Sequence, residues 1–181
     1  MAAPRLSVNV ASIKETGLDL PLELGEDWFS RWQEEDPDLE FAGPGSIQVK
    51  LRVEKHGRDI LLRGHLKGRL ELQCSRCLTP FAAPVEADFD LLLVPGPEPV
   101  TAEPEELTAT DLDLDFYTGE VVDLEAILRE QILLLLPLKP LCAESCRGLC
   151  PHCGADLNQE TCACGVDKSS SPFAALAKLK I

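Results

Sequence analysis

Hydrophobic and polar positions alternate most regularly between Ser46 and Val94, and this alternation predicts three β-strands. A turn at KHGRD leads into the second strand, whose apolar face runs from Leu62 to Cys74, and a third strand follows CSRCLTP, from Ala83 to Leu93. In each strand the opposite face is polar or charged, as expected of a sheet that is packed on one side. The segment 46–94 is therefore predicted to be a three-stranded antiparallel meander. The apolar face of its first strand consists of Ile47, Val49, Leu51 and Val53.

The two faces also predict how the second and third strands pair, because a slip by one residue would turn every side chain to the wrong side. Closing the hairpin around CSRC sets three apolar pairs, which are Leu72 with Ala83, Leu70 with Val85 and Leu66 with Phe89. The same register sets three pairs of opposite charge, which are Arg69 with Glu86, Lys67 with Asp88 and His65 with Asp90. Cross-strand charge pairs contribute roughly 0.2–1 kcal/mol each. We expect the third strand to neutralise much of the basic charge on the second, and Lys50 and Arg52 on the outer strand to remain available.

A helix is predicted to begin at Asp123 and to end before Pro137. Asp123 is a suitable N-cap, and Glu125 lies in the first turn, where the helix dipole favours an anion. The second half of this helix, ILLLLP, is apolar on nearly all sides, and we expect it to be buried against the open face of the sheet. Its stripe consists of Leu124, Ile127, Leu128, Gln131, Leu134 and Leu135.

The remaining segments are less regular. Residues 1–45 predict a strand near residues 6–10 and a short helix over 26–34, followed by a chain breaker at Gly43-Pro44-Gly45. An acidic, proline-rich loop over 95–110 precedes a possible edge strand, DLDLDF, in the segment 111–141, and Ser171-Pro172 begins a last short helix. The predicted fold is α+β, with an antiparallel meander packed by one buried helix. We expect a core domain over 1–141 and a cysteine-rich, zinc-binding tail over 142–181.

Charge and hydropathy narrow the class of protein. The net charge of −14 argues against a protein that wraps nucleic acid as a general polycation. The charge is uneven, because residues 46–81 are net +5 whereas residues 1–45 and 82–131 are net −7 and −13. No apolar run is long enough to span a membrane, and the start lacks the apolar core of a secretory signal. We therefore expect a cytoplasmic protein, in a compartment that keeps thiols reduced, with neither a membrane nor a small molecule as its partner.

Eight cysteines in four close pairs suggest two metal sites with four thiolates each. The segment Cys150-Pro-His-Cys153-Gly has the form of a zinc knuckle, in which the glycine permits a tight return of the chain. Cys162 and Cys164 can supply the other two ligands of this site.

The second predicted site joins distant parts of the chain. Cys74 and Cys77 cap the hairpin, and Cys142 and Cys146 follow the buried helix, so a shared ion would tie sheet, helix and tail together. The alternatives for Cys74 and Cys77 are two small buried side chains or a redox dithiol. A redox dithiol favours a helix N-terminus, whereas the flanking pattern here is that of a strand. We expect one or two structural Zn²⁺ ions, with an iron–sulfur cluster as the second choice.

The sequence contains no recognisable catalytic group. The three histidines, His56, His65 and His152, lie in no nucleophile motif, and there is no glycine-rich phosphate loop. A zinc ion held by four cysteines has no open position for water. We therefore expect a protein that is not an enzyme.

Four ordered blocks of the sequence resemble the YceD family, which is named for the accumulation of the large ribosomal RNA subunit. They are CSRCLTPF after the second strand, GEVVDLEAILREQILLLLPLKPLC, CRGLCPHCGADLN and SPFAALAKL, and they cover the chain from about Ile60 to its end. The resemblance implies a bacterial, cytosolic factor that large-subunit rRNA needs in order to accumulate, with a role in ribosome assembly and no assigned catalysis. Some family members lack the counterpart of Cys150–Cys164 but keep that of Cys74 and Cys77, which implies that the tail knuckle is an accessory.

Two charged surfaces are candidates for contact with a direct partner, which we expect to be a ribosomal protein, large-subunit rRNA or both. A basic ribosomal protein would be held by acidic side chains: Glu103, Glu105, Glu106, Asp111, Asp113 and Asp115. Ribosomal RNA would be contacted by basic side chains: Lys50, Arg52, Arg63, Lys67, Arg69 and Arg76. The alternative function is a redox or metal-responsive regulator that uses Cys74 and Cys77.

Overall fold

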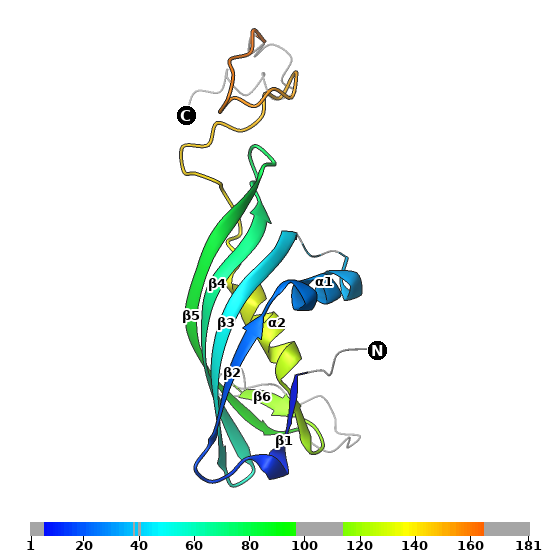
Figure 1. Ribbon diagram of the computed structural model, residues 1–181, viewed down its shortest axis with the longest axis vertical. Coiled ribbons are helices and arrows are strands. Elements are labelled where there is room, and N and C mark those ends of the chain that lie inside the picture. Colours follow the sequence, from blue (N-terminus) through cyan, green and yellow to red (C-terminus); the bar gives the residue numbers. More distant parts are fainter. Residues whose placement is uncertain (1–5, 38, 40, 97–113, 165–181) are drawn as a thin grey trace, which may run out of the picture.

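A curved sheet of long strands dominates the computed structural model, which describes residues 6–37, 39, 41–96 and 114–164 (Figure 1). Within these residues the sheet has five strands in the order β2-β3-β4-β5-β6. Its centre is an antiparallel meander of β3 (Phe41–His56), β4 (Asp59–Gln73) and β5 (Pro80–Pro95). The three strands predicted from residue 46 onward are confirmed, and so is the burial of one face, which includes Ile47, Val49, Leu51 and Val53.

The predicted register between β4 and β5 is wrong by two residues. Leu72 pairs with Phe81 and Leu70 with Ala83, because the hairpin turn is shorter than we expected. The ladder extends to Gln73 and Pro80, and beyond it the backbone N–H of Cys74 donates to the Thr79 carbonyl at 3.0 Å. A two-residue slip leaves every side chain on its own face, so the alternation alone cannot detect it.

Two short strands border the meander. β2 (Leu18–Leu24) pairs with β3 and was not predicted, although Leu18, Leu20, Leu22 and Leu24 alternate with polar residues and proline. Pro21 is tolerated there because β2 is an edge strand, so no ladder hydrogen bond is lost on its open side. On the other side β6 (Leu114–Tyr117) lies parallel to β5, which confirms an edge strand in this region but makes the sheet mixed.

A separate pair of strands and a short helix complete the N-terminal part. β1 (Ser7–Asn9) pairs with β7 (Val121–Asp123), and the 3₁₀ helix η1 (Val10–Ser12) follows β1. The strand expected near residues 6–10 is therefore confirmed, but it stops before Val10.

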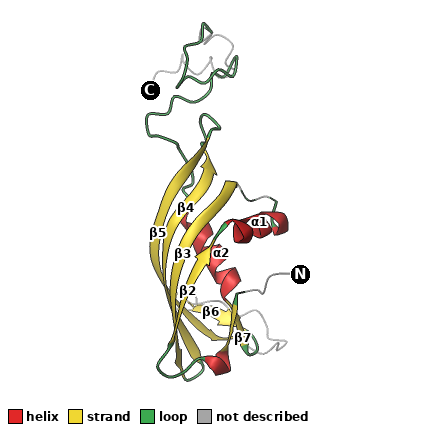
Figure 2. Ribbon diagram, viewed as in Figure 1, coloured by secondary structure: helices red, strands yellow, loops and turns green. Residues whose placement is uncertain are grey.

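Both helices pack on one face of the sheet and share its hydrophobic core (Figure 2). The helix α1 (Glu26–Glu35) buries Trp28, Phe29 and Trp32, whose rings contact one another and Phe41 on β3. The helix α2 (Leu124–Leu135) begins where we predicted, with the Asp123 carboxylate accepting from the backbone N–H of Ala126 at 3.1 Å.

The expectation that the whole second half of α2 is buried is wrong. Ile132 is fully buried, but Leu133 is 42% exposed and Leu134 is 71% exposed. At 3.6 residues per turn, only one side of a helix can face the sheet, and these two leucines lie on the other side.

Gly43-Pro44-Gly45 does not break the chain as we expected. The strand β3 begins at Phe41 and passes through this tripeptide with two irregularities in its pairing to β4. A Cβ atom on Gly45 would lie 2.8 Å from the Phe29 ring and 2.9 Å from Leu70, so the glycine lets the strand pass close beneath α1.

Several predictions concern parts of the chain outside the described residues. These are the acidic loop beyond residue 96, the start of the predicted edge strand, and the helix from Ser171. The division into a domain over 1–141 and a tail over 142–181 stays a prediction. In the described part of the chain, none of the helices has the length and apolar character needed to cross a membrane.

Candidate metal centres

The first cysteine tetrad lies at the tip of the β4–β5 hairpin. Cys74 and Cys77 come from the turn, and Cys142 and Cys146 come from the segment that follows α2. The four Sγ atoms all lie within 4.8 Å of one another, with 3.8 Å between Cys74 and Cys146 and 3.6 Å between Cys77 and Cys142. Four sulfurs at about 2.3 Å from a tetrahedral zinc ion would be about 3.8 Å apart. The structure therefore brings together the four residues predicted for this site in a geometry that can hold a metal ion.

The second tetrad is built from the tail alone. Cys150, Cys153, Cys162 and Cys164 also place their Sγ atoms within 4.8 Å of one another. Cys150 is buried, whereas Cys153 and Cys164 are exposed, so this site lies closer to solvent than the first.

The two Cys-x-x-Cys turns have the same backbone geometry. In each, the residue after the second cysteine has a positive φ, which is 58° for Leu78 and 76° for Gly154. The backbone N–H of that residue donates to the carbonyl of the first cysteine, from Leu78 to Cys74 and from Gly154 to Cys150, at 2.9 Å in both cases. We expected this tight return at Gly154. The tight return at Leu78 could not be predicted from the sequence, because leucine rarely adopts a positive φ.

The backbone around the first tetrad is held by a dense set of hydrogen bonds. The N–H of Ser75 donates to the Pro140 carbonyl at 2.9 Å, and the N–H of Leu149 donates to the Arg76 carbonyl at 3.0 Å. The Arg76 guanidinium donates to the carbonyls of Cys146 at 2.7 Å and Glu144 at 3.2 Å. Arg76, predicted as a contact for RNA, thus uses some of its hydrogen-bond donors to hold the segment that carries Cys142 and Cys146.

The second tetrad's loop also reaches the first tetrad, through Asn158. The Asn158 side-chain amide donates to Cys146 Sγ at 3.4 Å, and its oxygen accepts from the backbone N–H of Arg147 at 2.7 Å. A bridge between Leu149 and Asp156 closes the same loop. The two sites are therefore adjoining. Asn158 was missed because no ligand spacing marks a residue that contacts a thiol from outside the tetrad.

The thiols of each tetrad differ in acidity. Burial raises the pKa of Cys74, but hydrogen bonds from the backbone N–H groups of Cys142, Cys77 and Arg76 outweigh burial and lower this pKa to about 6. The pKa of Cys142 is raised to about 12, chiefly by its hydrogen bond with Cys77 and then by burial. In the second tetrad, backbone hydrogen bonds from Cys153 and His152 lower the pKa of Cys150 to about 6, whereas the hydrogen bond with Cys153 raises that of Cys164 to about 12.

Crowded thiols of this kind suit a cation. Four thiolates repel one another when nothing neutralises them, so at neutral pH a metal ion must displace protons as it binds. A closed tetrahedral site with four sulfurs leaves no position for water, which is the arrangement of a structural metal site. A redox dithiol of Cys74 and Cys77 fits less well, because the pair lies in a β-hairpin turn and shares its space with two more thiols.

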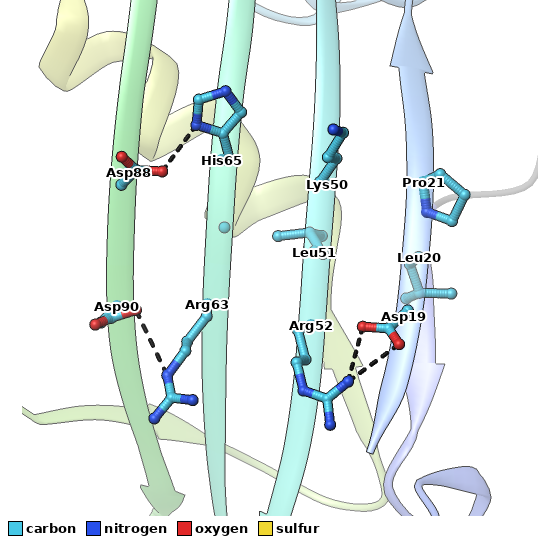
Figure 3. Close-up of a pocket in the computed structure, with 11 residues that line it drawn as sticks. Asp19, Leu20, Pro21, Lys50, Leu51, Arg52, Arg63, His65, Asp88 and Asp90 are labelled. Atoms are coloured by element: carbon cyan, nitrogen blue, oxygen red, sulfur yellow. Dashed lines mark hydrogen bonds and ion pairs between the residues drawn. The ribbon is translucent and has the colours of Figure 1, made fainter. Parts of the chain in front are cut away.

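The basic side chains on the outer face of the sheet are mostly paired with carboxylates. Arg52 donates to both oxygens of Asp19 at 3.0 Å (Figure 3). It also donates to Glu54 at 3.0 Å, so the expectation that Arg52 is available is wrong. Its partner Asp19 lies on β2, the strand that the sequence pattern did not predict. Arg63 contacts Glu54 at 3.2 Å and Asp90 at 3.9 Å.

The charge pairs between β4 and β5 exist, but with partners shifted by the two-residue slip. Lys67 pairs with Glu86 at 3.0 Å, and His65 with Asp88 at 2.8 Å. Arg69 faces Pro84 across the ladder, where Glu86 was expected. Within the described residues no ion pair involves Lys50 or Arg69. A shallow groove of about 550 Å³ lies on this face between two rows of such side chains (Figure 3).

The acidic candidates for contact with a basic partner can be placed only in part. Asp115 lies on β6 and is half-buried. The other five, Glu103, Glu105, Glu106, Asp111 and Asp113, lie outside the described residues.

Comparison with protein families supports the resemblance seen in the sequence. Residues 62–180 match the family model described as "Large ribosomal RNA subunit accumulation protein YceD". This match covers about two thirds of the chain, including both cysteine tetrads.

Individual relatives come from bacteria and plants. The chain is 32% identical over 114 residues to an uncharacterized protein of Mycobacterium tuberculosis, covering 63% of this chain and 53% of that protein. It is 25% identical over 161 residues to the Arabidopsis thaliana protein named large ribosomal RNA subunit accumulation protein YCED homolog 1, chloroplastic, covering 74% of this chain and 48% of the relative. The Zea mays protein of the same name is 27% identical over 143 residues, covering 65% and 48%. The chain thus spans about half the length of these relatives, and no solved structure matches it.

Proposed function

The chain belongs to the YceD family of large ribosomal RNA subunit accumulation proteins, and we propose that it acts as a non-enzymatic factor in ribosome assembly. In this proposal it supports the accumulation of large-subunit rRNA by binding a basic ribosomal protein until that protein is transferred to the rRNA. The names of the plant relatives support a role in the accumulation of this RNA. We propose that the protein acts in the cytoplasm.

The observation that favours a protein partner is the neutralisation of the basic residues on the sheet. Arg52, Arg63 and Lys67 each contact a carboxylate within 3.2 Å, so few positive charges are left for phosphate groups. The chain as a whole is net −14, and residues 82–131 are net −13. An acidic surface attracts basic proteins and repels RNA, and added salt weakens both effects.

Direct contact with large-subunit rRNA is the second candidate. It is favoured by Lys50 and Arg69, which lie on the outer face and have no ion pair within the described residues. Two isolated positive charges would support weak binding only, because affinity for RNA grows with the number of phosphates neutralised.

We propose zinc as the metal in both tetrads, with a structural role. Each tetrad offers four cysteine sulfurs that lie within 4.8 Å of one another, a donor set that tetrahedral zinc favours. The first ion would join the β4–β5 hairpin turn to the chain after α2, and the second would close the loop of the tail. Native mass spectrometry of the protein as purified would count the ions and identify their mass.

The partner can be tested with immobilised protein and two pools, purified large-subunit ribosomal proteins and protein-free large-subunit rRNA. We expect the protein to retain at least one basic ribosomal protein at low salt and to release it as the salt concentration rises. Retention of rRNA that is lost in a Lys50→Glu, Arg69→Glu double variant would establish the second candidate instead. If no ribosomal protein is retained even at low salt, binding of a basic protein is wrong.

A further inference from the structure

Most of the outer edge of β5 has no neighbouring strand among the described residues. β4 pairs with β5 from Pro80 to Leu93 on one side. On the other side β6 pairs only with Leu92 to Pro95. Figure 1 shows β5 as the outermost long strand of the curved sheet. In the part of the chain that the structure describes, the stretch from Pro80 to Leu91 is therefore an open edge.

The register determines which backbone groups point out from this edge. The Cys74 N–H donates to the Thr79 carbonyl, so the backbone N–H and C=O groups of Thr79 point toward β4. Because the ladder has no irregularity, the backbone groups of every second residue from Phe81 to Leu91 also point toward β4. The residues between them point their N–H and C=O groups outward. Two of these, Pro80 and Pro84, have no N–H, as expected where a strand lacks a partner. The outward N–H groups belong to Ala82, Glu86, Asp88 and Asp90.

Three of these four residues also carry carboxylates on the outer face of the sheet. The side chains of Glu86, Asp88 and Asp90 are 56%, 86% and 72% exposed. Their partners in the described structure, Lys67, His65 and Arg63, all lie on β4. Figure 3 shows two of these pairs, His65 with Asp88 and Arg63 with Asp90. Within the described residues, every ion pair of these carboxylates is to a side chain on β4, and none comes from the open side. The carboxylates repeat at every second position, which is the spacing of side chains on one face of a strand.

We propose that this open edge binds an extended, basic segment of a protein partner, which pairs with β5 as an additional strand. Backbone hydrogen bonds to Glu86, Asp88 and Asp90 would supply affinity, and lysine or arginine at alternate positions of the segment would meet the three carboxylates. This inference rests on the proposed function and specifies how the basic protein is recognised.

Charge argues against two other occupants of the edge. A second copy of this chain would bring the same acidic row against itself, and like charges across a ladder are destabilising. The segment 97–113 of the chain carries six acidic residues and no basic one, so it would be repelled in the same way. A basic partner is the occupant that the carboxylates favour.

Acidic residues and prolines on an edge can also serve only to prevent aggregation. The two roles differ in a measurable way. Protection against aggregation predicts that removing the charge or the N–H changes solubility and leaves partner binding unchanged, whereas docking predicts loss of binding.

The test uses the full chain, the pool of large-subunit ribosomal proteins, and a defined probe, a peptide of alternating lysine and valine. Glu86→Pro removes an outward N–H without touching the ladder to β4, and its matched control Glu86→Gln removes the same charge but keeps the N–H. Asp88→Lys reverses a charge on the edge, and its matched control Glu23→Lys makes the same change on β2, the opposite edge. Thermal unfolding and metal content confirm that each variant is folded.

We expect Glu86→Pro to bind the peptide about fivefold more weakly than Glu86→Gln, as for the loss of one hydrogen bond. Asp88→Lys should weaken binding about tenfold, and Glu23→Lys should not. The bound peptide should slow hydrogen exchange at Glu86, Asp88 and Asp90.

The outcomes separate this inference from the proposed function. If the wild-type chain retains ribosomal proteins but all four variants retain them equally, the edge is not the docking site and the proposed function stands. If the chain retains no ribosomal protein, the proposed function fails first. If peptide binding appears only after truncation of residues 165–181, which carry three lysines, the edge is occupied by the chain's own end and the inference is overturned.

Discussion

Leu78 carries an unusual backbone conformation for its residue type. Its φ is 58°, in the left-handed region, and its side chain is exposed, with 53% of the residue accessible to solvent. A side chain in this region costs roughly 1–2 kcal/mol, and the corresponding position in the second turn is Gly154. The hydrogen bond that closes the turn around the first tetrad thus forms against a local preference of the sequence.

Replacing Leu78 by glycine should therefore stabilise the protein. We expect Leu78→Gly to raise the free energy of unfolding by about 0.5–1 kcal/mol, because relief of the left-handed strain exceeds the extra freedom that glycine has in the unfolded chain. Urea unfolding of the zinc-loaded protein measures this difference. A loss of stability would instead mean that the partly exposed leucine side chain holds the turn through its contacts.

Asn158 acts on the first tetrad from the loop of the second. Its amide donates to Cys146 Sγ at 3.4 Å, which holds that ligand in position. We expect Asn158→Ala to weaken metal binding at the first tetrad about 10–100-fold, the usual effect of removing an outer hydrogen bond to a ligand. Competition with a chromogenic chelator measures this affinity.

Gln159→Ala is the matched control for Asn158. Gln159 donates to Asp156 at 2.9 Å in the same loop and has no hydrogen bond to a thiol in the described structure. Its removal should leave the affinity of the first tetrad within about twofold of wild type. Equal weakening by both variants would show that the loop acts through its folding and that the amide has no separate effect.

For the strands, the sequence predicts which face is buried but not how neighbouring strands pair. Alternation identifies the buried faces of β3, β4 and β5, since it depends only on which residues avoid water. It cannot identify the register, because slipping by two residues keeps Leu66 and Leu70 on the buried face while exchanging Phe89 for Ala87 opposite Leu66. β2 escaped prediction because Pro21 and two charged residues dilute its leucine pattern.

The metal sites likewise have features that the sequence predicts and features that it does not. The two tetrads could be predicted, because cysteine is a rare residue and its spacing is specific to metal binding. The contacts that join the sites could not, because Asn158 and Arg76 are common polar residues whose partners are backbone groups or a thiol far away in the sequence.

Gly68 allows β3 and β4 to approach closely just beyond the irregular part of β3. It pairs with Ile47, and a Cβ atom at Gly68 would overlap the backbone oxygen of Ser46 and lie 2.7 Å from the Ile47 Cα. These are backbone atoms, which cannot rotate away as the end of a side chain can. We expect Gly68→Ala to lower the free energy of unfolding by about 2–3 kcal/mol, by forcing the strands apart.

Gly43→Ala is the matched substitution for Gly68→Ala. A Cβ atom at Gly43 would lie 3.5 Å from the Glu71 Cβ, an ordinary contact, so the change should cost less than about 0.5 kcal/mol. Thermal or urea unfolding of both variants checks the difference. Similar losses in the two would mean that the strands accommodate a methyl group equally well at both positions.

The two tetrads differ in what they connect across the whole molecule. The first joins the β4–β5 hairpin to the chain after α2, and Cys77 and Cys142 are 65 positions apart in the sequence. The second closes a short loop within the tail. A link between distant residues removes more freedom from the unfolded chain than a local one, so the first tetrad should contribute more to the stability of the sheet.

This difference predicts unequal effects of removing one ligand from each site. With zinc in excess, we expect Cys142→Ser to lower the free energy of unfolding by about 2–4 kcal/mol, and Cys162→Ser to lower it by less than about 1 kcal/mol. Trp28 and Trp32 lie in the core beneath the sheet, so their fluorescence during urea unfolding reports on this part of the molecule. Counting ions by native mass spectrometry establishes which tetrad is loaded in each variant. Equal losses, with the first tetrad still loaded in Cys162→Ser, would mean that the tail site stabilises the sheet as strongly as the site that joins the sheet to the chain after α2.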